Sequence, residues 1–375
     1  MIIKGEHKQT IWIDQKNPGS VYTFDQRYFP HETRIVELQS TDDVAEAIKS
    51  MVVRGAPLIG VTAAYGMYLA ALAYEGATLY DEMIEAADFL NKTRPTAVNL
   101  HWAIQEQLKV VEGNKQLNHV DLASLLLENA EKLKKEDITT CSAIGDYGLS
   151  LIREISQFKG GKEVNILTHC NAGWLACIDW GTATSPIYKA YDAGIRIHVW
   201  VDETRPRLQG ANLTAFELAE HGVPHTVITD NAGGHLMQHG EVDMVIVGTD
   251  RVTRTGDVAN KIGTYLKALA ANDNHIPFYV ALPSTTIDWT ISNGLTEIPI
   301  ETRSPNEIHK VMGKTKEGKL VKVRITPENS SAINHGFDVT PSRLVSALIT
   351  ERGICEATEN GLLSLFPEFM THELH

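Results

Sequence analysis

The densest group of chemically active side chains follows a short apolar strand late in the chain. Val245-Ile-Val247 has the composition of a strand buried on both faces, and Asp250 comes soon after it. Because parallel sheets bind ligands beyond the carboxyl ends of their strands, we expect Asp250 to face a crevice. The run 256–261 is predicted to open a helix, where free backbone amides and Lys261 would favour an anion. An acid beside an anion site indicates a phosphorylated substrate.

A second candidate catalytic group, the thiol of Cys170, follows another predicted strand. Thr168-His-Cys-Asn-Ala-Gly173 ends the apolar run 164–168 and continues into a turn of small residues. Backbone amides at such a turn lower the pKa of a thiol, which matters because an ordinary thiol, with a pKa of about 8.5, is mostly protonated at neutral pH. Each residue taken singly also has a simpler interpretation. Cys170 is then a small buried hydrophobic residue, and Asp250 is a helix-capping or ion-pair carboxylate.

Three other segments carry groups suited to holding a phosphate. Arg54 lies on a glycine-containing turn before a predicted helix with proline near its start, and Arg94 repeats this layout. Gln209 comes just ahead of another predicted helix, where an amide adds a hydrogen bond without charge. Either arginine alone is better explained as a solvated charge at a helix boundary. Two of them in an acidic protein favour a polar cleft.

The elements that must position these groups follow two periodicities. Short β-like pieces at 9–14 and 20–24 are separated by a turn signal, Asn17-Pro-Gly19, and apolar residues then recur at helical spacing over 44–53, 57–74, 81–91 and 120–155. After Gly160 the apolar runs become short and rich in β-formers, at 164–168, 195–201, 225–229, 242–247 and 277–282. Helix-compatible segments such as 213–220 and 262–271 separate these runs, which predicts a parallel, doubly wound α/β sheet. The segment 312–323 indicates a late hairpin.

A chain of 375 residues is long for one hydrophobic core, so we expect two domains. The change of periodicity falls between about 120 and 160, and 158–162 is the clearest local break. We assign residues 1–140 to a mostly helical domain with a small β-hairpin or sheet. Residues 141–375 form the parallel-sheet domain.

Composition excludes several classes of protein. A formal charge of −13 argues against nucleic acid or an anionic membrane as a partner, because both require an excess of Lys and Arg. No apolar run reaches the ~20 residues needed to span a bilayer, and the start lacks the layout of a signal peptide, so a cytoplasmic location is expected. Four scattered cysteines form no disulfide framework, and His235 and His239 lack further ligands for a zinc site, so no metal is expected.

Together these segments resemble the methylthioribose-1-phosphate isomerase family, which is related to the regulatory subunits of translation initiation factor 2B. The resemblance covers most of residues 40–345. It is carried by Arg54-Gly-Ala-Pro57, Arg94-Pro-Thr-Ala-Val-Asn99, Leu167-Thr-His-Cys-Asn-Ala-Gly173, Val201-Asp-Glu-Thr-Arg-Pro-Arg-Leu-Gln-Gly210, Gly256-Asp-Val-Ala-Asn-Lys-Ile-Gly-Thr-Tyr265 and Ile276-Pro-Phe-Tyr-Val280.

The resemblance implies a helical amino-terminal domain followed by a Rossmann-like domain, in a homodimer. It also implies an isomerase that converts a ring-closed aldose 1-phosphate to a ketose 1-phosphate in methionine salvage, without a redox or metal cofactor. The family's catalytic cysteine and aspartate fall on Cys170 and Asp250. Its substrate-binding residues fall on Arg54, Gly55, Ala56, Arg94, Gln209, Asn260 and Lys261.

Two departures from the family pattern are expected to affect how the group on C5 of the sugar is bound. Bulky Trp174 and Trp180 follow the cysteine motif, and a late strand ends in the segment 281–289. A related branch of the family acts on 5-deoxyribose 1-phosphate, and a difference of one small apolar group is worth only about 1–3 kcal/mol, so both substrates stay open. Ribose 1,5-bisphosphate would need extra positive charge. A non-catalytic regulator of the translation-factor type is the competing class, although a scaffold needs neither the thiol nor the acid.

Overall fold

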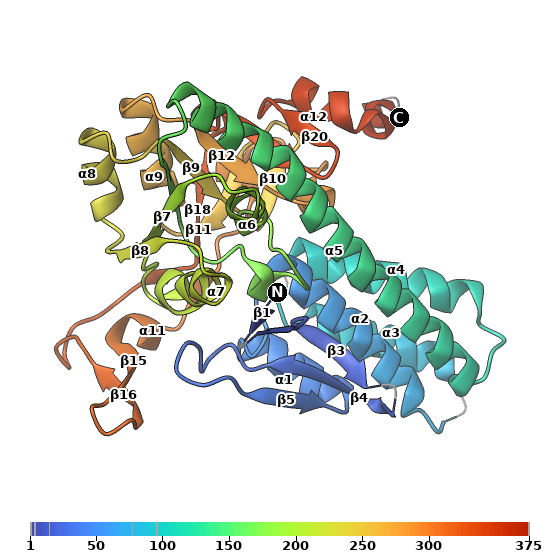
Figure 1. Cartoon of the computed structure of the whole chain (residues 1–375). Coiled ribbons are helices and arrows are strands. Elements are labelled where there is room, and N and C mark those ends of the chain that lie inside the picture. Colours follow the sequence, from blue (N-terminus) through green and yellow to red (C-terminus); the bar gives the residue numbers. More distant parts are fainter. Residues whose placement is uncertain (1, 4, 15, 77, 95–96, 374–375) are drawn as a thin grey trace. The chain divides into compact units, whose positions relative to one another are not determined.

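The computed structural model describes residues 2–3, 5–14, 16–76, 78–94 and 97–373 and divides into two compact units. The first unit comprises Met1–Ser142 and Gly173–Gly181, and the second comprises Ala143–Ala172 and Thr182–His375. Figure 1 shows the elements of both, coloured along the chain. Helix α5 (His119–Phe158) supplies its first part to one unit and its last part to the other.

The first unit combines a small antiparallel sheet with a group of helices. The three-stranded sheet has the order β3 (Ile11–Asp14), β4 (Asn17–Phe24) and β5 (Ile35–Leu38). The other elements are β1 (Ile2–Ile3), β2 (Glu6–His7), α1 (Thr41–Lys49), α2 (Ala56–Leu72), α3 (Leu79–Asn91), α4 (Val98–Gly113) and the start of α5. The predicted helices are thus confirmed. The turn predicted at Asn17–Gly19 was wrong, because these residues begin β4 and Asn17 pairs with Asp14.

Helix α2 is the centre of this unit. It is apolar around most of its circumference, so nearly all its residues are buried. Gly60 lets it cross α4 closely, since a Cβ atom there would lie 2.8 Å from the carbonyl oxygen of Asn99. Consequently the beginnings of α2 and α4 lie together.

The second unit is built on a seven-stranded sheet. Its order is β20-β19-β12-β9-β6-β7-β8, and every neighbouring pair is parallel except β19–β20. The strands are β6 (Val164–Thr168), β7 (Ile197–Asp202), β8 (His225–Ile228), β9 (Met244–Val247), β12 (Phe278–Ala281), β19 (Ala347–Thr350) and β20 (Gly353–Cys355). The five predicted strands and the doubly wound arrangement are confirmed. The chain order reverses between β6 and β9, which is where this class of fold binds its ligands.

The helices of this unit alternate with its strands, as predicted. They are α6 (Thr184–Asp192), the π-helical turn η2 (Gly210–Thr214), α7 (Ala215–His221), α8 (Ala232–Gln238), α9 (Thr264–Asp273), α10 (Gly294–Glu297), α11 (Asn306–His309) and α12 (Glu359–Leu365), with short 3-10 turns η3 (Ser284–Thr286), η4 (Ser342–Leu344) and η5 (Pro367–Glu373). The predicted hairpin is formed by β15 (Lys310–Lys314) and β16 (Leu320–Arg324). A further small pair joins β14 (Thr302–Arg303) to β17 (Asn334–His335).

The helix predicted to open within 256–261 was wrong. Residues Val258–Lys261 form the buried strand β11, paired with β10 (Arg251–Thr253) and β18 (Phe337–Thr340) in a four-stranded sheet completed by β13 (Ile287–Asp288). Cross-strand pairing outweighs the local helix signal here because all four side chains of β11 are buried. Helix α9 starts only at Thr264, after Gly263 turns the chain with a φ of 104°.

The segment 173–181, which contains the 3-10 turn η1 (Trp174–Ala176), packs with the first unit although it follows β6 in sequence. The hydroxyl of Thr10 lies within 3.0 Å of the carbonyl oxygens of Trp174, Cys177 and Ile178. The indole of Trp174 meets Phe24 edge-on. No periodicity marks this segment, because its contacts are made with residues distant in sequence.

Among the described helices none has the length and apolar character needed to cross a bilayer. The four cysteines are all buried thiols rather than disulfides.

The carboxyl of Asp137 in α5 provides a pH test of the first unit. It accepts a hydrogen bond from the backbone N–H of Ile178 at 2.8 Å, and withdrawal from water raises the pKa of Asp137 to about 7. Since an unfolded aspartate has a pKa of about 3.9, the folded state keeps a proton that the unfolded state releases between those values. We expect the free energy of unfolding to fall as pH rises through this window and then to level off.

Replacing Asp137 by Asn should remove this dependence while an amide oxygen still accepts the Ile178 hydrogen bond. Urea unfolding of both proteins across the pH range measures it. Parallel stability curves for wild type and Asp137→Asn would contradict the assignment.

Candidate active site

The candidate catalytic groups of the second unit lie at the carboxyl ends of neighbouring parallel strands. Cys170 follows β6, Gln209 follows β7 and Asp250 follows β9. Because β6 pairs in parallel with both β7 and β9, these ends share one edge of the sheet. Cys170 and Asp250 flank the point at which the strand order reverses.

A close backbone contact joins the loops that follow β6 and β9. A Cβ atom on Gly248 would lie 2.4 Å from the Cβ atom of Ala172 and 3.2 Å from the hydroxyl of Thr182. Only glycine permits this approach. The loop carrying Cys170 therefore packs directly on the loop carrying Asp250.

Cys170 is held in an uncommon backbone conformation. Its φ is 67°, in the left-handed region that side chains with a Cβ atom rarely adopt. Its N–H donates to the hydroxyl of Thr204 at 2.8 Å, and its carbonyl oxygen accepts from the hydroxyl of Thr214 at 2.6 Å. Two tertiary hydrogen bonds thus offset the local strain, a pattern found at functional sites.

Asp250 lies between β9 and β10 and is partly exposed. Its N–H donates to the carbonyl oxygen of Ala259 at 3.0 Å, which sets it beside Asn260 on β11. The guanidinium of the next residue, Arg251, lies 3.5 Å from a carboxylate oxygen of Asp288. Burial lowers the pKa of Arg251, and Asp288 counteracts part of this effect.

Asn260 and Lys261 are buried on β11. The amide of Asn260 donates to the hydroxyl of Thr264 at 3.0 Å, and the ammonium of Lys261 donates to the carbonyl oxygen of Gly336 at 3.0 Å. The Lys261 ammonium also lies 5.1 Å from the centre of the Phe337 ring. Both residues therefore act from a strand rather than from a helix start.

The helix start that follows Lys261 is that of α9. A carboxylate of the protein occupies it, since the N–H groups of Gly263 and Tyr265 donate to Asp338 at 2.7 and 3.1 Å. Burial raises the pKa of Asp338, while these two hydrogen bonds oppose the rise. The start of α9 is therefore not available to a phosphate.

Gln209 is buried at the end of β7, next to η2. Its side-chain oxygen has no hydrogen-bond partner among the residues that the structure describes. The following residue must be glycine, because a Cβ atom on Gly210 would lie 1.7 Å from the carbonyl oxygen of Asp202. A buried amide oxygen of this kind suits a ligand hydroxyl.

The remaining candidates lie in the first unit, before helices α2 and α4. Gly55 precedes Ala56, the first residue of α2, and buried Arg54 precedes Gly55. Arg94 precedes α4, and its carbonyl oxygen accepts from the N–H of Ala97 at 3.0 Å. Both arginines thus precede helices that cross closely, since a Cβ atom on Gly60 of α2 would lie 2.8 Å from the carbonyl oxygen of Asn99 in α4. Pro95 and Thr96 of the second motif lie outside the described residues.

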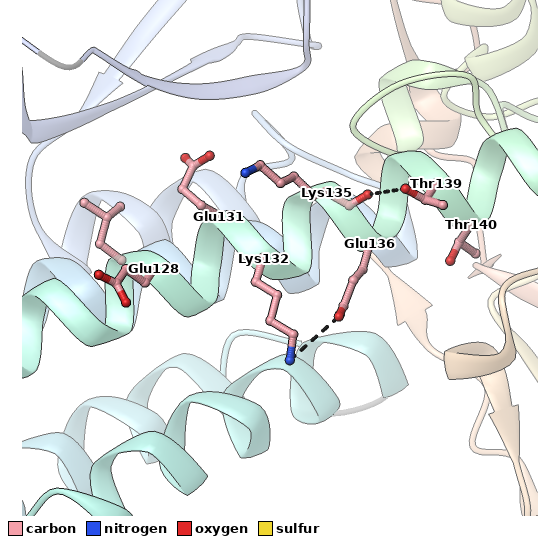
Figure 2. A pocket seen from close by; sticks show the side chains of 8 residues that line it. Glu128, Glu131, Lys132, Lys135, Glu136, Thr139 and Thr140 are labelled. Atoms are coloured by element: carbon pink, nitrogen blue, oxygen red, sulfur yellow. Dashed lines mark hydrogen bonds and ion pairs between the residues drawn. The ribbon is translucent and has the colours of Figure 1, made fainter.

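A hollow of about 690 Å³ lies on α5, and its lining differs from that of the candidate active site. Figure 2 shows its side chains projecting from this one helix, with an ion pair of 3.7 Å between Lys132 and Glu136. Its acids and lysines alternate in sign, as on a solvated helix face. None of the candidate site residues lines it, so we do not assign it to the active site.

Among the residues that the structure describes, two groups of side chains have possible metal-ligand atoms within 4.8 Å of one another, namely Asp137–Cys141–Cys177 and His169–Asp202–Asp230. In the first, a hydrogen bond with Cys177 and burial raise the pKa of Cys141, which keeps its thiol protonated. In the second, the ammonium of Lys267 lies 3.2 Å from Asp202 and supplies the positive charge that a metal ion would otherwise provide. We interpret both as hydrogen-bonded clusters.

The sequence interpretation missed the residues that support Cys170. Thr204, Thr214 and His169 hold its loop, and Asp202 in turn holds His169. Three of them lie inside the quoted motifs, but only tertiary contacts distinguish a supporting hydroxyl or imidazole from a solvated one.

Gly55 supplies a stability test of the first unit. Its φ is 91°, and a Cβ atom there would lie 2.5 Å from the backbone of Ala176. Gly55→Ala should therefore lower the free energy of unfolding by about 1–3 kcal/mol. Gly113→Ala at the end of α4 is the matched control, since nothing lies within 4 Å of a Cβ atom there and alanine favours a helix. Equal effects of the two substitutions in urea unfolding would contradict the tight contact.

The chain is similar to known proteins over most of its length. The family model described as the initiation factor 2 subunit family matches residues 52–357. A protein of Desulfatibacillum aliphaticivorans named methylthioribose-1-phosphate isomerase is 55% identical over 372 residues, covering 99% of this chain and 100% of that protein.

Two solved structures are similar over nearly the whole chain. The 5-methylthioribose 1-phosphate isomerase from Pyrococcus horikoshii OT3 is 38% identical, with a TM-score of 0.83 and coverage of 97% of each chain. The delta subunit of translation initiation factor eIF-2B from A. fulgidus is 37% identical, with a TM-score of 0.78, and covers 96% of this chain and 100% of its own. The chain therefore belongs to the initiation factor 2 subunit family and, within it, to the methylthioribose-1-phosphate isomerases.

Proposed function

We propose that this protein is an aldose–ketose isomerase that converts 5-methylthioribose 1-phosphate to 5-methylthioribulose 1-phosphate in methionine salvage. The observation that carries the proposal is that a thiol, Cys170, and a carboxyl, Asp250, follow the two neighbouring strands, β6 and β9, between which the strand order reverses. Full-length relatives named methylthioribose-1-phosphate isomerase support the proposal.

The substrate explains why the reaction needs both groups. A sugar phosphorylated at its anomeric carbon presents no free aldehyde, so the ring must open while the phosphate stays attached. In our proposal Asp250 protonates the ring oxygen, and the Cys170 thiolate removes the proton at C2 to give an enediol phosphate. Return of that proton from Cys170 to C1, with loss of the C2 hydroxyl proton to the Asp250 carboxylate, completes the ketose and restores both groups.

Substrate binding is proposed for the other candidates. Arg54, Arg94 and Lys261 would balance the charge of the phosphate, and Gly55 and Ala56 would contribute their backbone N–H groups. Gln209 and Asn260 would orient the sugar by hydrogen bonds. Binding by a few specific groups suits this chain, because a protein with a formal charge of −13 does not attract anions over its whole surface.

We further propose that the protein is a cytoplasmic homodimer of two domains, 1–140 and 141–375. The family resemblance supports the dimer, and four cysteines that remain thiols support a reducing compartment. Sedimentation of the purified protein would test the dimer, and a monomer at working concentration would contradict it.

Two alternatives differ in the group on C5 or in the class of protein. 5-Deoxyribose 1-phosphate lacks the methylthio group, and the bulky Trp174 and Trp180 motivate its inclusion as a substrate. A regulatory subunit that binds ligands without turnover is motivated by the similarity to the eIF-2B delta subunit. Assays with 5-methylthioribose 1-phosphate, 5-deoxyribose 1-phosphate and ribose 1,5-bisphosphate discriminate among these. No turnover of any of the three would favour the regulator.

The catalytic assignment predicts a specific kinetic pattern. Cys170→Ser and Asp250→Asn should each lower kcat by about 10²–10⁴-fold with a much smaller change in substrate affinity, because each removes a proton-transfer group but not a phosphate contact. Cys355→Ser is the control for loss of a buried thiol elsewhere in the same unit. Wild-type turnover in either variant would remove that residue from the mechanism.

The proton-transfer route itself is tested in heavy water. If Cys170 carries the C2 proton and exchanges it with solvent, deuterium should appear at C1 of the ketose, as measured by NMR of the product. A rival hydride shift from C2 to C1 would retain the original hydrogen completely. A shielded base would reduce the deuterium content without abolishing it over many turnovers of the reversible reaction.

A further inference from the structure

His169 immediately precedes Cys170 and is almost completely buried. Its Nδ1 lies 2.9 Å from a carboxylate oxygen of Asp202, and its Nε2 lies 2.9 Å from the carbonyl oxygen of Ile262. Gly263 closes over the ring, since a Cβ atom there would lie 3.0 Å from it. A carbonyl oxygen only accepts, so Nε2 carries a hydrogen that it donates to Ile262.

The charges around the ring favour a hydrogen on Nδ1 as well. Asp202 is fully buried, and the ammonium of Lys267 lies 3.2 Å from the carboxylate oxygen that faces His169. Asp230 adds a second carboxylate, 3.9 Å from Nδ1, and its backbone carbonyl accepts from Lys267. Asp338 also interacts electrostatically with His169. The same oxygen of Asp202 thus faces both the ammonium of Lys267 and Nδ1 of His169, which places it as the acceptor of hydrogen bonds from both.

These contacts connect three segments of the candidate site. His169 stands at the end of β6 next to Cys170, and Asp202 ends β7 shortly before Thr204, whose hydroxyl accepts from the Cys170 N–H. Ile262 follows Lys261 directly. One ring therefore sets the separation between the thiol and the strand that carries Asn260 and Lys261.

We propose that His169 is a positioning residue for the isomerisation, and that it holds the Cys170 loop against the end of β11 by donating hydrogen bonds from both ring nitrogens. The proposal rests on the proposed function, because it treats Cys170 as the base and β11 as part of the substrate site. His169 itself is not assigned any contact with the substrate.

The experiment compares His169→Ala, His169→Gln and His169→Asn. Alanine removes both hydrogen bonds, whereas the longer Gln retains a donor toward Ile262 and the shorter Asn retains one toward Asp202. We expect kcat of His169→Ala to fall about a hundredfold, as for a misplaced reacting group, with a smaller rise in KM, and at least one amide variant to recover part of the loss. His221→Gln, which removes a histidine paired with Asp192 at the carboxyl end of α7, is the matched control. Folded His169→Ala with the kcat of wild type would overturn the proposal.

Two measurements keep the test independent of turnover. Ring-nitrogen NMR should show hydrogens on both nitrogens of His169 in wild type, and only on Nε2 in Asp202→Asn, where the neutral amide can itself donate to Nδ1. Alkylation with iodoacetamide, mapped by mass spectrometry, should be several-fold faster at Cys170 in His169→Ala than in wild type and unchanged at Cys355.

These readouts separate the two proposals. If wild type turns over none of the three sugar phosphates but the NMR and alkylation results are as expected, the proposed function fails and the positioning of the Cys170 loop by His169 stands. If wild type is active and His169 shows one ring hydrogen with unchanged alkylation at Cys170, the positioning proposal fails alone.

Discussion

The parallel pairing of β6 with β7 and β9 is the constraint on which the catalytic half of this protein depends. Strands β6 and β9 bury apolar side chains on both faces and β7 buries them on one face, so their register is maintained by the core rather than by the loops. Parallel register brings their carboxyl ends to one edge of the sheet. The Cys170 and Asp250 loops then need only short connections to meet, and the Gly248–Ala172 contact is the result.

Backbone strain at Cys170 is retained because its surroundings hold the residue from several sides. Hydroxyls of Thr204 and Thr214 engage both of its backbone polar groups, while His169 ties the preceding residue to Asp202 and Ile262. These partners come from different strand ends and helices. The position of the Cys170 thiol thus depends on all of these residues at the edge of the sheet. A substitution of any one of them is expected to affect the thiol from a distance.

The charged groups inside the second unit are matched by partners close to them. The helix end that would ordinarily attract an anion is already occupied by Asp338, and the buried cation Lys267 is matched by Asp202. What remains for a phosphate in our proposal is a small number of specific cations and backbone groups. An acidic protein can bind an anionic metabolite in this way without general affinity for nucleic acids or anionic membranes.

The sequence by itself determined the helical character of residues 41–158, the five central strands and the positions of Cys170, Gln209 and Asp250 after strand ends, because these follow from periodicity and from abrupt changes between apolar and polar residues. It misassigned Val258–Lys261, where local composition favoured a helix start but pairing with β10 and β18 made a strand. It was also silent on the packing of 173–181 with the first unit and on the supports of Cys170. Only the tertiary structure decided these points, because strand pairing, the capping of α9 by Asp338 and the contacts of His169 join residues that are far apart in the chain, and no local pattern encodes such partners.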